Sequence, residues 1–294
     1  MKATNAPAYG EIRGIVLMLA SVCLFTATSL LLSHAHHAYE ISGWVAACYR
    51  AAAGLSMIWL LQVRTGRPAI GRIFTRPLLF VRGFVGGATI PAYYISIMEL
   101  GPGRAGLIAG SWPLFAALFA ALLIGESLSR KYFIYIGLAL IGLAAVFAAN
   151  GIGIGNPAYD GLAIAGAAAG GLCVVMIRHL RHTESTGTIF ASQCVFTLLI
   201  GLPVARGSLW IDEPVALGLV VLASLSVALA QLSLTEAFRH ISVAKGSTLQ
   251  MLTPALTVLG SALLLGENFN AYELVGGACI LLASYQIALA KAAK

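Results

Sequence analysis

A regularly spaced row of polar side chains lies inside one long apolar stretch of the sequence, residues 243–265. Its members follow one another at intervals of three and four residues, so a helix would place all of them on one face. Inside lipid such a face must contact another helix or a water-filled cavity, where it could hydrogen-bond a small ligand. The members of the row are Ser247, Gln250, Pro254, Thr257 and Ser261.

Four side chains within apolar segments carry a polar group that needs a partner: Gln231, Gln250, Tyr94 and Trp112. An unpaired amide in hydrocarbon is costly, so the two glutamines should face a partner helix or a wet cavity. Lining of a binding cavity and hydrogen bonding between helices both remain open for all four. Tyr94 and Trp112, with Phe25 and Met251, predict an apolar, aromatic wall that suits a substrate with a large flat side chain.

Arg50 is the basic residue that lies well inside an apolar segment. A charge buried in a membrane is usually functional or paired. Arg50 could therefore bind a substrate carboxylate, or it could form a structural ion pair with Glu40 or Glu99. We favour the structural role.

The residues needed for catalysis are missing from the apolar segments. Apart from Glu99 and Glu236 at segment ends, we expect no carboxylate there, and the five cysteines show no metal-ligand spacing. The sequence therefore predicts neither an enzyme nor a metal or cofactor site. Proton-driven antiporters normally place an acid near the middle of the membrane, so transport by this chain would be facilitative.

Composition identifies the environment of these residues. Of 294 residues, 59% are hydrophobic and 10% are charged, and the mean hydropathy is +0.89, far from the values of soluble domains. Apolar runs of about 20 residues follow one another, which predicts an all-α integral membrane protein with ten transmembrane helices. The predicted spans are 12–32, 41–61, 80–100, 105–124, 132–149, 161–177, 188–204, 215–237, 243–265 and 272–290.

The basic residues test this count and orient the chain. With ten spans, fifteen of the eighteen Lys and Arg residues fall on one side, Arg82 among them, and only Arg104 and Arg206 fall on the other. The positive-inside rule makes the basic side cytoplasmic, so both termini should be cytoplasmic in a bacterial inner membrane. Anionic lipid and the positive-inside rule both favour basic residues at the cytoplasmic membrane edge, which accounts for the net charge of +7. No nucleic acid partner is therefore expected.

An internal repeat relates the two halves. Arg104, Pro113 and the pair Gly125-Glu126 recur as Lys245, Pro254 and Gly266-Glu267, all at an offset of 141 residues. An odd number of spans separates the copies, so the halves, residues 12–149 and 158–291, should be inverted repeats of five helices each. Such repeats are typical of secondary transporters, whose halves exchange roles as the site opens to either side.

These motifs resemble the EamA-type branch of the drug/metabolite transporter superfamily, whose halves carry a proline in the fourth helix and a Gly-Glu at its end. Within it the chain looks most like the aromatic amino acid exporters of the YddG type. The resemblance implies a cavity between the halves and export of small metabolites, with aromatic and other neutral amino acids as substrates and no need for an oligomer. Efflux of hydrophobic drugs or other metabolites by proton antiport is the alternative.

The repeated prolines and glutamates have separate predicted roles. Pro113 and Pro254 should bend their helices and free carbonyl groups, which are tolerated only where protein or a cavity receives them. Packing alone would also explain them. Glu126 and Glu267 should end their helices on opposite sides of the membrane, as gate or capping residues.

Overall fold

The computed structural model describes residues 6–62, 70–124, 130–148, 156–180, 183–237, 240–241, 246 and 249–292, and these are helical with short connections. The helices follow the apolar runs because a backbone in lipid must satisfy its hydrogen bonds within its own segment. They are α1 (Ala6–Tyr39), α2 (Gly43–Gln62), α3 (Arg72–Thr75), α4 (Pro77–Leu100), α5 (Pro102–Ala109), α6 (Trp112–Ile124), α7 (Arg130–Ala148), α8 (Pro157–Leu180), α9 (Thr186–Ala205), α10 (Pro214–Ala237), α12 (Leu252–Leu264) and α13 (Ala271–Ala292).

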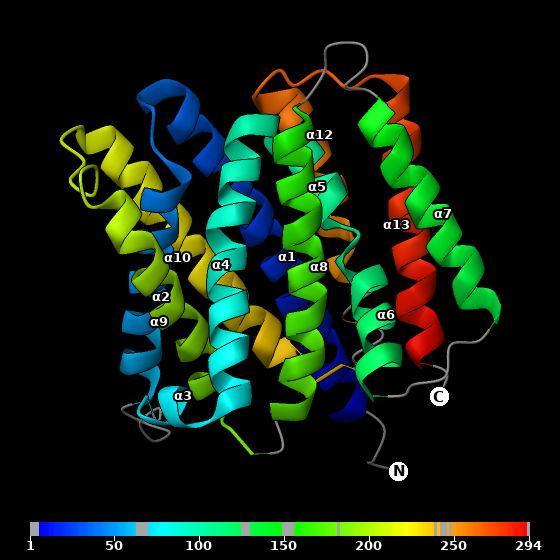
Figure 1. The fold of residues 1–294 in the computed structure, drawn as a ribbon, viewed down its shortest axis with the longest axis horizontal. Coiled ribbons are helices and arrows are strands. Elements are labelled where there is room, and N and C mark those ends of the chain that lie inside the picture. Colours follow the sequence, from blue (N-terminus) through cyan, green and yellow to red (C-terminus); the bar gives the residue numbers. More distant parts are fainter. Residues whose placement is uncertain are drawn as a thin grey trace.

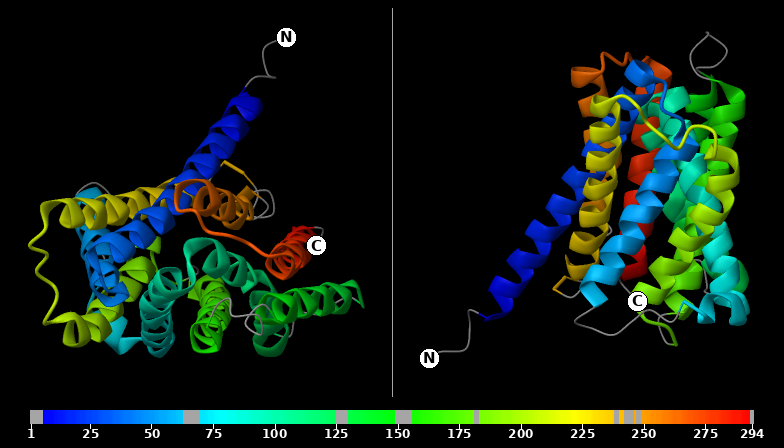
Figure 2. Two further views of the ribbon diagram at one scale, coloured as in Figure 1. Left: turned by 90° about the horizontal axis from the view of Figure 1, so that it is seen from above. Right: turned by 90° about the vertical axis from the view of Figure 1, so that its left-hand side faces the viewer.

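The helices form one bundle, with both ends of the chain at the same end of it (Figure 1). Helix α1 packs along α10, α13 along α7, and α4 along both α8 and α9. Viewed along the bundle, α1 leans outward toward its N-terminus, beyond the other helices (Figure 2). Helices far apart in the sequence thus lie side by side in the bundle.

Small residues set the distance between α4 and α9. A methyl group on Gly83 would lie 2.6 Å from the ring of Phe196, and one on Gly87 would lie 2.7 Å from its Cβ. Only glycine permits this approach. The close packing brings polar groups of α4 and α9 within hydrogen-bonding distance inside the bundle.

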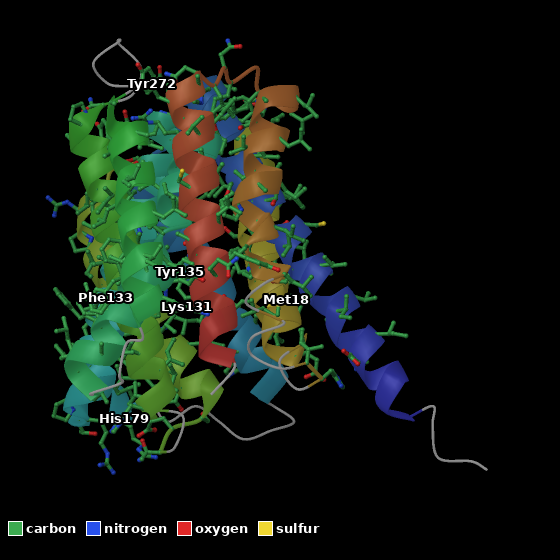
Figure 3. The ribbon with its side chains drawn as sticks, turned by 90° about the vertical axis from the view of Figure 1, so that its right-hand side faces the viewer. Met18, Lys131, Phe133, Tyr135, His179 and Tyr272 are labelled. Atoms are coloured by element: carbon green, nitrogen blue, oxygen red, sulfur yellow. The ribbon has the colours of Figure 1, made fainter. Side chains whose placement is uncertain are left out.

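The outward faces are apolar, as a lipid environment requires. Side chains of α7 project from the bundle in Figure 3, and Phe133, Ile134 and Ile141 are 64%, 68% and 65% exposed. In the described part of the chain, six helices are long and apolar enough to cross a membrane, and two shorter apolar helices lie at residues 133–146 and 252–264. The described chain is an all-helical membrane bundle.

Candidate functional site

Two interrupted helices cross near the middle of the bundle. Helix α5 ends at Ala109 and α6 begins at Trp112, while α12 begins directly after Met251. Both interruptions lie three residues before a proline, and both prolines sit in the first turn of the following helix, where a missing N–H is tolerated. Pro113 and Pro254 are therefore at breaks rather than at bends within continuous helices. A methyl group on Gly110 would lie 3.3 Å from Pro254 Cγ, so the breaks pack against each other.

The carbonyl groups freed at the first break have partners. Gly110 O accepts a hydrogen bond of 2.9 Å from Ser284 Oγ of α13. Ile108 O accepts from the Ser111 hydroxyl at 2.7 Å and from the Ser111 N–H at 3.0 Å. On the other side of the crossing, Gln250 Oε1 and Thr253 Oγ1 are buried without a partner among the described residues. Polar atoms available to a ligand thus lie on the α12 side.

The structure distributes the other predicted residues over several helices. Phe25 in α1, Trp112 in α6 and Gln231 in α10 are half-buried, and Met251 is buried beside the α12 break. In the row of residues 243–265, Thr257 and Ser261 are buried with Pro254, and Ser247 lies outside the described residues. These side chains do not share one cavity with Arg50.

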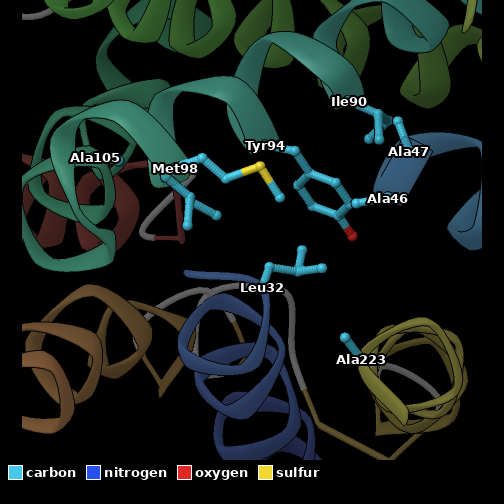
Figure 4. Close-up of a cluster of buried hydrophobic side chains, with 9 residues drawn as sticks. Leu32, Ala46, Ala47, Ile90, Tyr94, Met98, Ala105 and Ala223 are labelled. Atoms are coloured by element: carbon cyan, nitrogen blue, oxygen red, sulfur yellow. The ribbon is translucent and has the colours of Figure 1, made fainter. Parts of the chain in front are cut away.

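Tyr94 is a core residue next to Arg50. It is 2% exposed and packs among Leu32, Ala46, Ile90 and their neighbours (Figure 4). Its hydroxyl oxygen has no hydrogen-bond partner among the described residues. The guanidinium carbon of Arg50 lies 5.6 Å from the centre of the Tyr94 ring, which is a cation–π distance.

Arg50 lines a small cavity between α2, α4 and α9. The cavity has a volume of about 10 Å³, enough for roughly one water molecule. Within the described chain, Arg50 forms no ion pair, and neither Glu40 nor Glu99 contacts it. A binding role for Arg50 therefore stays open in this conformation. The cavity is lined by Arg50, Ala51, Ile90, Phe190, Gln193, Cys194 and Thr197.

Arg82 is a second buried arginine close to this cavity, and sequence reasoning missed it. It lies in the second turn of α4 and is 5% exposed. Its Nη2 donates to Gln193 Oε1 at 3.0 Å, and Gln193 Nε2 donates to Gly86 O at 3.2 Å. Its Nε and Nη1 have no partner among the described residues. The charge had been counted at the cytoplasmic membrane edge, since its distance from the helix start is short.

Buried carboxylates correct one expectation. Asp160 in α8 and Glu273 in α13 are 0% and 2% exposed, although no acid beyond Glu99 and Glu236 was expected within the spans. Both pair with Arg104, itself 1% exposed, at 2.7 Å and 2.6 Å, and Arg104 Nη2 also donates to Val146 O. Both acids lie in the first turn of their helices: Asp160 just precedes the predicted span 161–177, and Glu273 lies inside the predicted span 272–290, where the expectation overlooked it. Arg104, too, just precedes a predicted span.

Glu267 caps the start of α5. Its carboxylate accepts the backbone N–H groups of Gly103 at 3.0 Å and Arg104 at 3.3 Å, where the helix dipole favours a negative charge. It lies in the connection between α12 and α13, where burial raises its pKa above the ordinary value of 4.5 and the hydrogen bonds to Gly103 and Arg104 oppose that shift. Glu267 was expected to act as a gate or capping residue at the end of its own helix, and the contacts seen are with the start of another helix, α5. The repeat partner, Glu126, lies outside the described residues.

The arrangement suits binding and movement of a ligand. Among the described residues, no group of three or more His, Cys, Asp or Glu side chains is placed to hold a metal ion. Interrupted helices crossing inside a membrane bundle, with polar groups and an arginine facing its interior, are features of transporters.

Comparison with known proteins gives the family. Residues 12–148 and 158–289 match the EamA-like transporter family, and the chain belongs to it. The chain is 28% identical over 288 residues to the pseudopaline exporter CntI of Pseudomonas aeruginosa, in strains UCBPP-PA14 and PAO1, covering 95% of this chain and 96% of the relative. A solved crystal structure superposes with a TM-score of 0.62 at 19% identity, over 95% of this chain and 97% of that one, which shows a shared fold. The protein is a multi-pass membrane transporter.

Proposed function

We propose that this protein exports small metabolites that carry a carboxylate group, and that Arg50 binds that group. The observation that supports this is an arginine at an internal cavity with no carboxylate partner in the described chain. A guanidinium remains charged in a protein and binds carboxylates with paired hydrogen bonds. The names of the two similar proteins, both exporters, support the direction of transport.

The body of the substrate is inferred from the neighbouring side chains and the sequence motifs. Tyr94 offers a buried aromatic ring and a hydroxyl group beside Arg50. Phe25, Trp112, Gln231, Gln250 and Met251 would join this wall in a wider conformation. Aromatic and other neutral amino acids are the substrates that the sequence motifs favour.

The architecture proposed is ten transmembrane helices in two inverted repeats, residues 12–149 and 158–291, in the inner membrane with cytoplasmic termini. The equivalence of the two helix breaks supports it. Gly110 and Met251, where the breaks lie, are 141 residues apart, the same offset that relates Pro113 to Pro254. Both termini at one end of the bundle are also consistent with an even number of crossings (Figure 1).

Alternating access would require two changes from this conformation. The cavity at Arg50, with room for about one water molecule, must widen to admit an amino acid. The ion pairs of Arg104 must also open. Glu273 lies in the first turn of α13, and the C-terminus of α13 lies at the end of the bundle where the chain termini are, so these ion pairs close the opposite end. We assign that end to the exit side, with Glu267 and Arg104 as parts of its gate.

We propose facilitative transport, without a coupled proton. The buried carboxylates of the described chain are already paired: Asp160 and Glu273 with Arg104, and Glu184 with Arg72. A proton-coupling acid must be accessible during the transport cycle, whereas these side chains are buried and bound to arginine.

Uptake into liposomes tests this function. Purified protein would be reconstituted and assayed with radiolabelled phenylalanine, tryptophan, threonine and glutamate, with and without a pH gradient. We expect saturable uptake that is independent of the gradient, and loss of uptake in Arg50→Gln but not in Arg206→Gln, a change at an exposed turn. Uptake of uncharged hydrophobic drugs alone, driven by the gradient, would instead establish proton-coupled drug efflux. No difference between the two variants would remove Arg50 from the site.

A further inference from the structure

Arg82 is a buried cation that has no role in the site proposed above, where Arg50 binds one carboxylate of the substrate. Of its three guanidinium nitrogens, only Nη2 has a partner, the amide oxygen of Gln193, while Nε and Nη1 have none in the described chain. Burying a charge with unmet hydrogen bonds is expensive, and arginine cannot lose its charge to relieve the cost. An ionisable residue buried within a membrane bundle is therefore a candidate for binding an anion during function.

Among the described residues, no carboxylate forms an ion pair with Arg82. On α8 and α9 the titratable groups facing it are the thiols of Cys173 and Cys194, and on α2 it faces Arg50, another cation. Thiols are mostly uncharged at pH 7. The carboxylates that form ion pairs in the described chain do so elsewhere, with partners Arg13, Arg72, Arg104 and His240.

Gln193 links Arg82 to the cavity at Arg50. Its side chain lines that cavity, and the same amide accepts from Arg82 and donates to Gly86 O. Its position is therefore fixed by two hydrogen bonds, and Arg82 lies directly behind it, one hydrogen bond away from the residues that line the cavity. Gly86 leaves the space that the guanidinium occupies, since a methyl group there would lie 2.6 Å from Arg82 Nη1.

We propose that Arg82, held by Gln193, binds a second anionic group of the substrate while Arg50 binds the first. The inference rests on the proposed function and adds to it a preference for organic acids with two or more carboxylates over substrates with one. A neutral amino acid would fill only the Arg50 half of this site. The two arginines repel each other when the site is empty, and a dianion would remove that repulsion as it binds.

Matched ligand pairs test the proposal. Glutamate and glutamine differ by one carboxylate, as do 4-carboxyphenylalanine and 4-carbamoylphenylalanine at a larger size. Each ligand would be measured as a competitor of radiolabelled phenylalanine uptake into liposomes. Its effect on the unfolding temperature of the purified protein in detergent would be measured as well. We expect the dicarboxylate of at least one pair to bind about tenfold more tightly or better than its amide.

Variants assign that preference to Arg82. Arg82→Gln should abolish the preference, whereas Arg82→Lys should retain part of it. Gln193→Glu places a carboxylate beside Arg82, so the two should form a buried ion pair that also abolishes the preference. Uptake of the monocarboxylate is measured in each variant as the readout of the Arg50 half of the site. The matched control is Arg76→Gln, an exposed arginine just before α4.

The outcomes separate the two proposals. Monocarboxylate transport with no dicarboxylate preference, or a preference unchanged in both Arg82→Gln and Gln193→Glu, would overturn the second subsite and leave the carboxylate exporter standing. If none of the four ligands binds or is transported, the carboxylate assignment itself fails and the subsite with it.

Discussion

Arg104 and Asp160 are joined by two parallel hydrogen bonds, from Nε to Oδ1 at 2.9 Å and from Nη2 to Oδ2 at 2.7 Å. They lie in different family-matched segments, 12–148 and 158–289, and Glu273 of the second segment completes the pairing at 2.6 Å. All three side chains are buried, so the charges are screened by neither water nor salt. The network ties the two segments together at the end of the bundle opposite the termini.

Asp160→Asn should destabilise the protein strongly. The change leaves Arg104 with reduced charge compensation in a buried site, for which a loss of about 3–5 kcal/mol is typical. Arg13→Gln is the control, because the Arg13–Glu236 pair is 4.0 Å apart with the arginine 58% exposed, and such pairs contribute about 1 kcal/mol or less. Thermal unfolding in detergent measures both. Equal unfolding temperatures for the two variants would show that the buried pair does not hold the segments together.

Glu267 should make stability depend on pH. Burial raises its pKa in the folded protein above 4.5, so the folded state holds this proton more tightly than the unfolded chain does. Its stabilising contribution is full below pH 4.5 and is lost as the pH rises through the raised pKa. Glu267→Gln keeps one acceptor for the α5 N–H groups and removes the titration.

Unfolding temperatures between pH 4.5 and 7.5 provide the measurement. We expect the wild-type protein to lose more stability across this range than Glu267→Gln does. The exposed Glu213 supplies a control, since Glu213→Gln should keep the wild-type slope. Parallel curves for all three proteins would rule out a titrating Glu267 in this range.

Local sequence patterns predicted the helices but not which helix ends are buried. Apolar runs mark helices because lipid requires them, and the repeated Pro and Gly-Glu motifs correctly drew attention to Pro254 and Glu267. Burial of Arg104, Asp160 and Arg82 depends on which helices pack over them, and that information is spread over segments far apart in the chain. From the sequence alone, a charged residue near the end of a helix is predicted to lie at the surface. Only the packing of α4 against α8 and α9 shows that Arg82 is inside.

Ser284→Ala should weaken the crossing of the interrupted helices. Ser284 Oγ donates to Gly110 O at the break between α5 and α6, and without it that buried carbonyl has lost its side-chain partner. An unsatisfied buried group costs about 1–3 kcal/mol. We expect a lower unfolding temperature and slower transport, whereas Ser56→Ala, on an exposed position of α2, should change neither. An unfolding temperature matching that of Ser56→Ala would mean that the Ser284 hydrogen bond contributes nothing measurable.

Gly86→Ala should move Arg82 without removing its charge. The added methyl group would lie 2.6 Å from Nη1, and the guanidinium, at the end of a flexible side chain, can shift away. The displacement should break the alignment of Arg82 with Gln193, so binding of dicarboxylates should weaken by about tenfold while monocarboxylate transport continues. Gly170→Ala in α8 is the control, because no atom lies within 4 Å of its added methyl group. Competition by glutamate and glutamine in liposomes measures the effect, and an unchanged ratio between them in Gly86→Ala would show that the position of Arg82 does not set the preference.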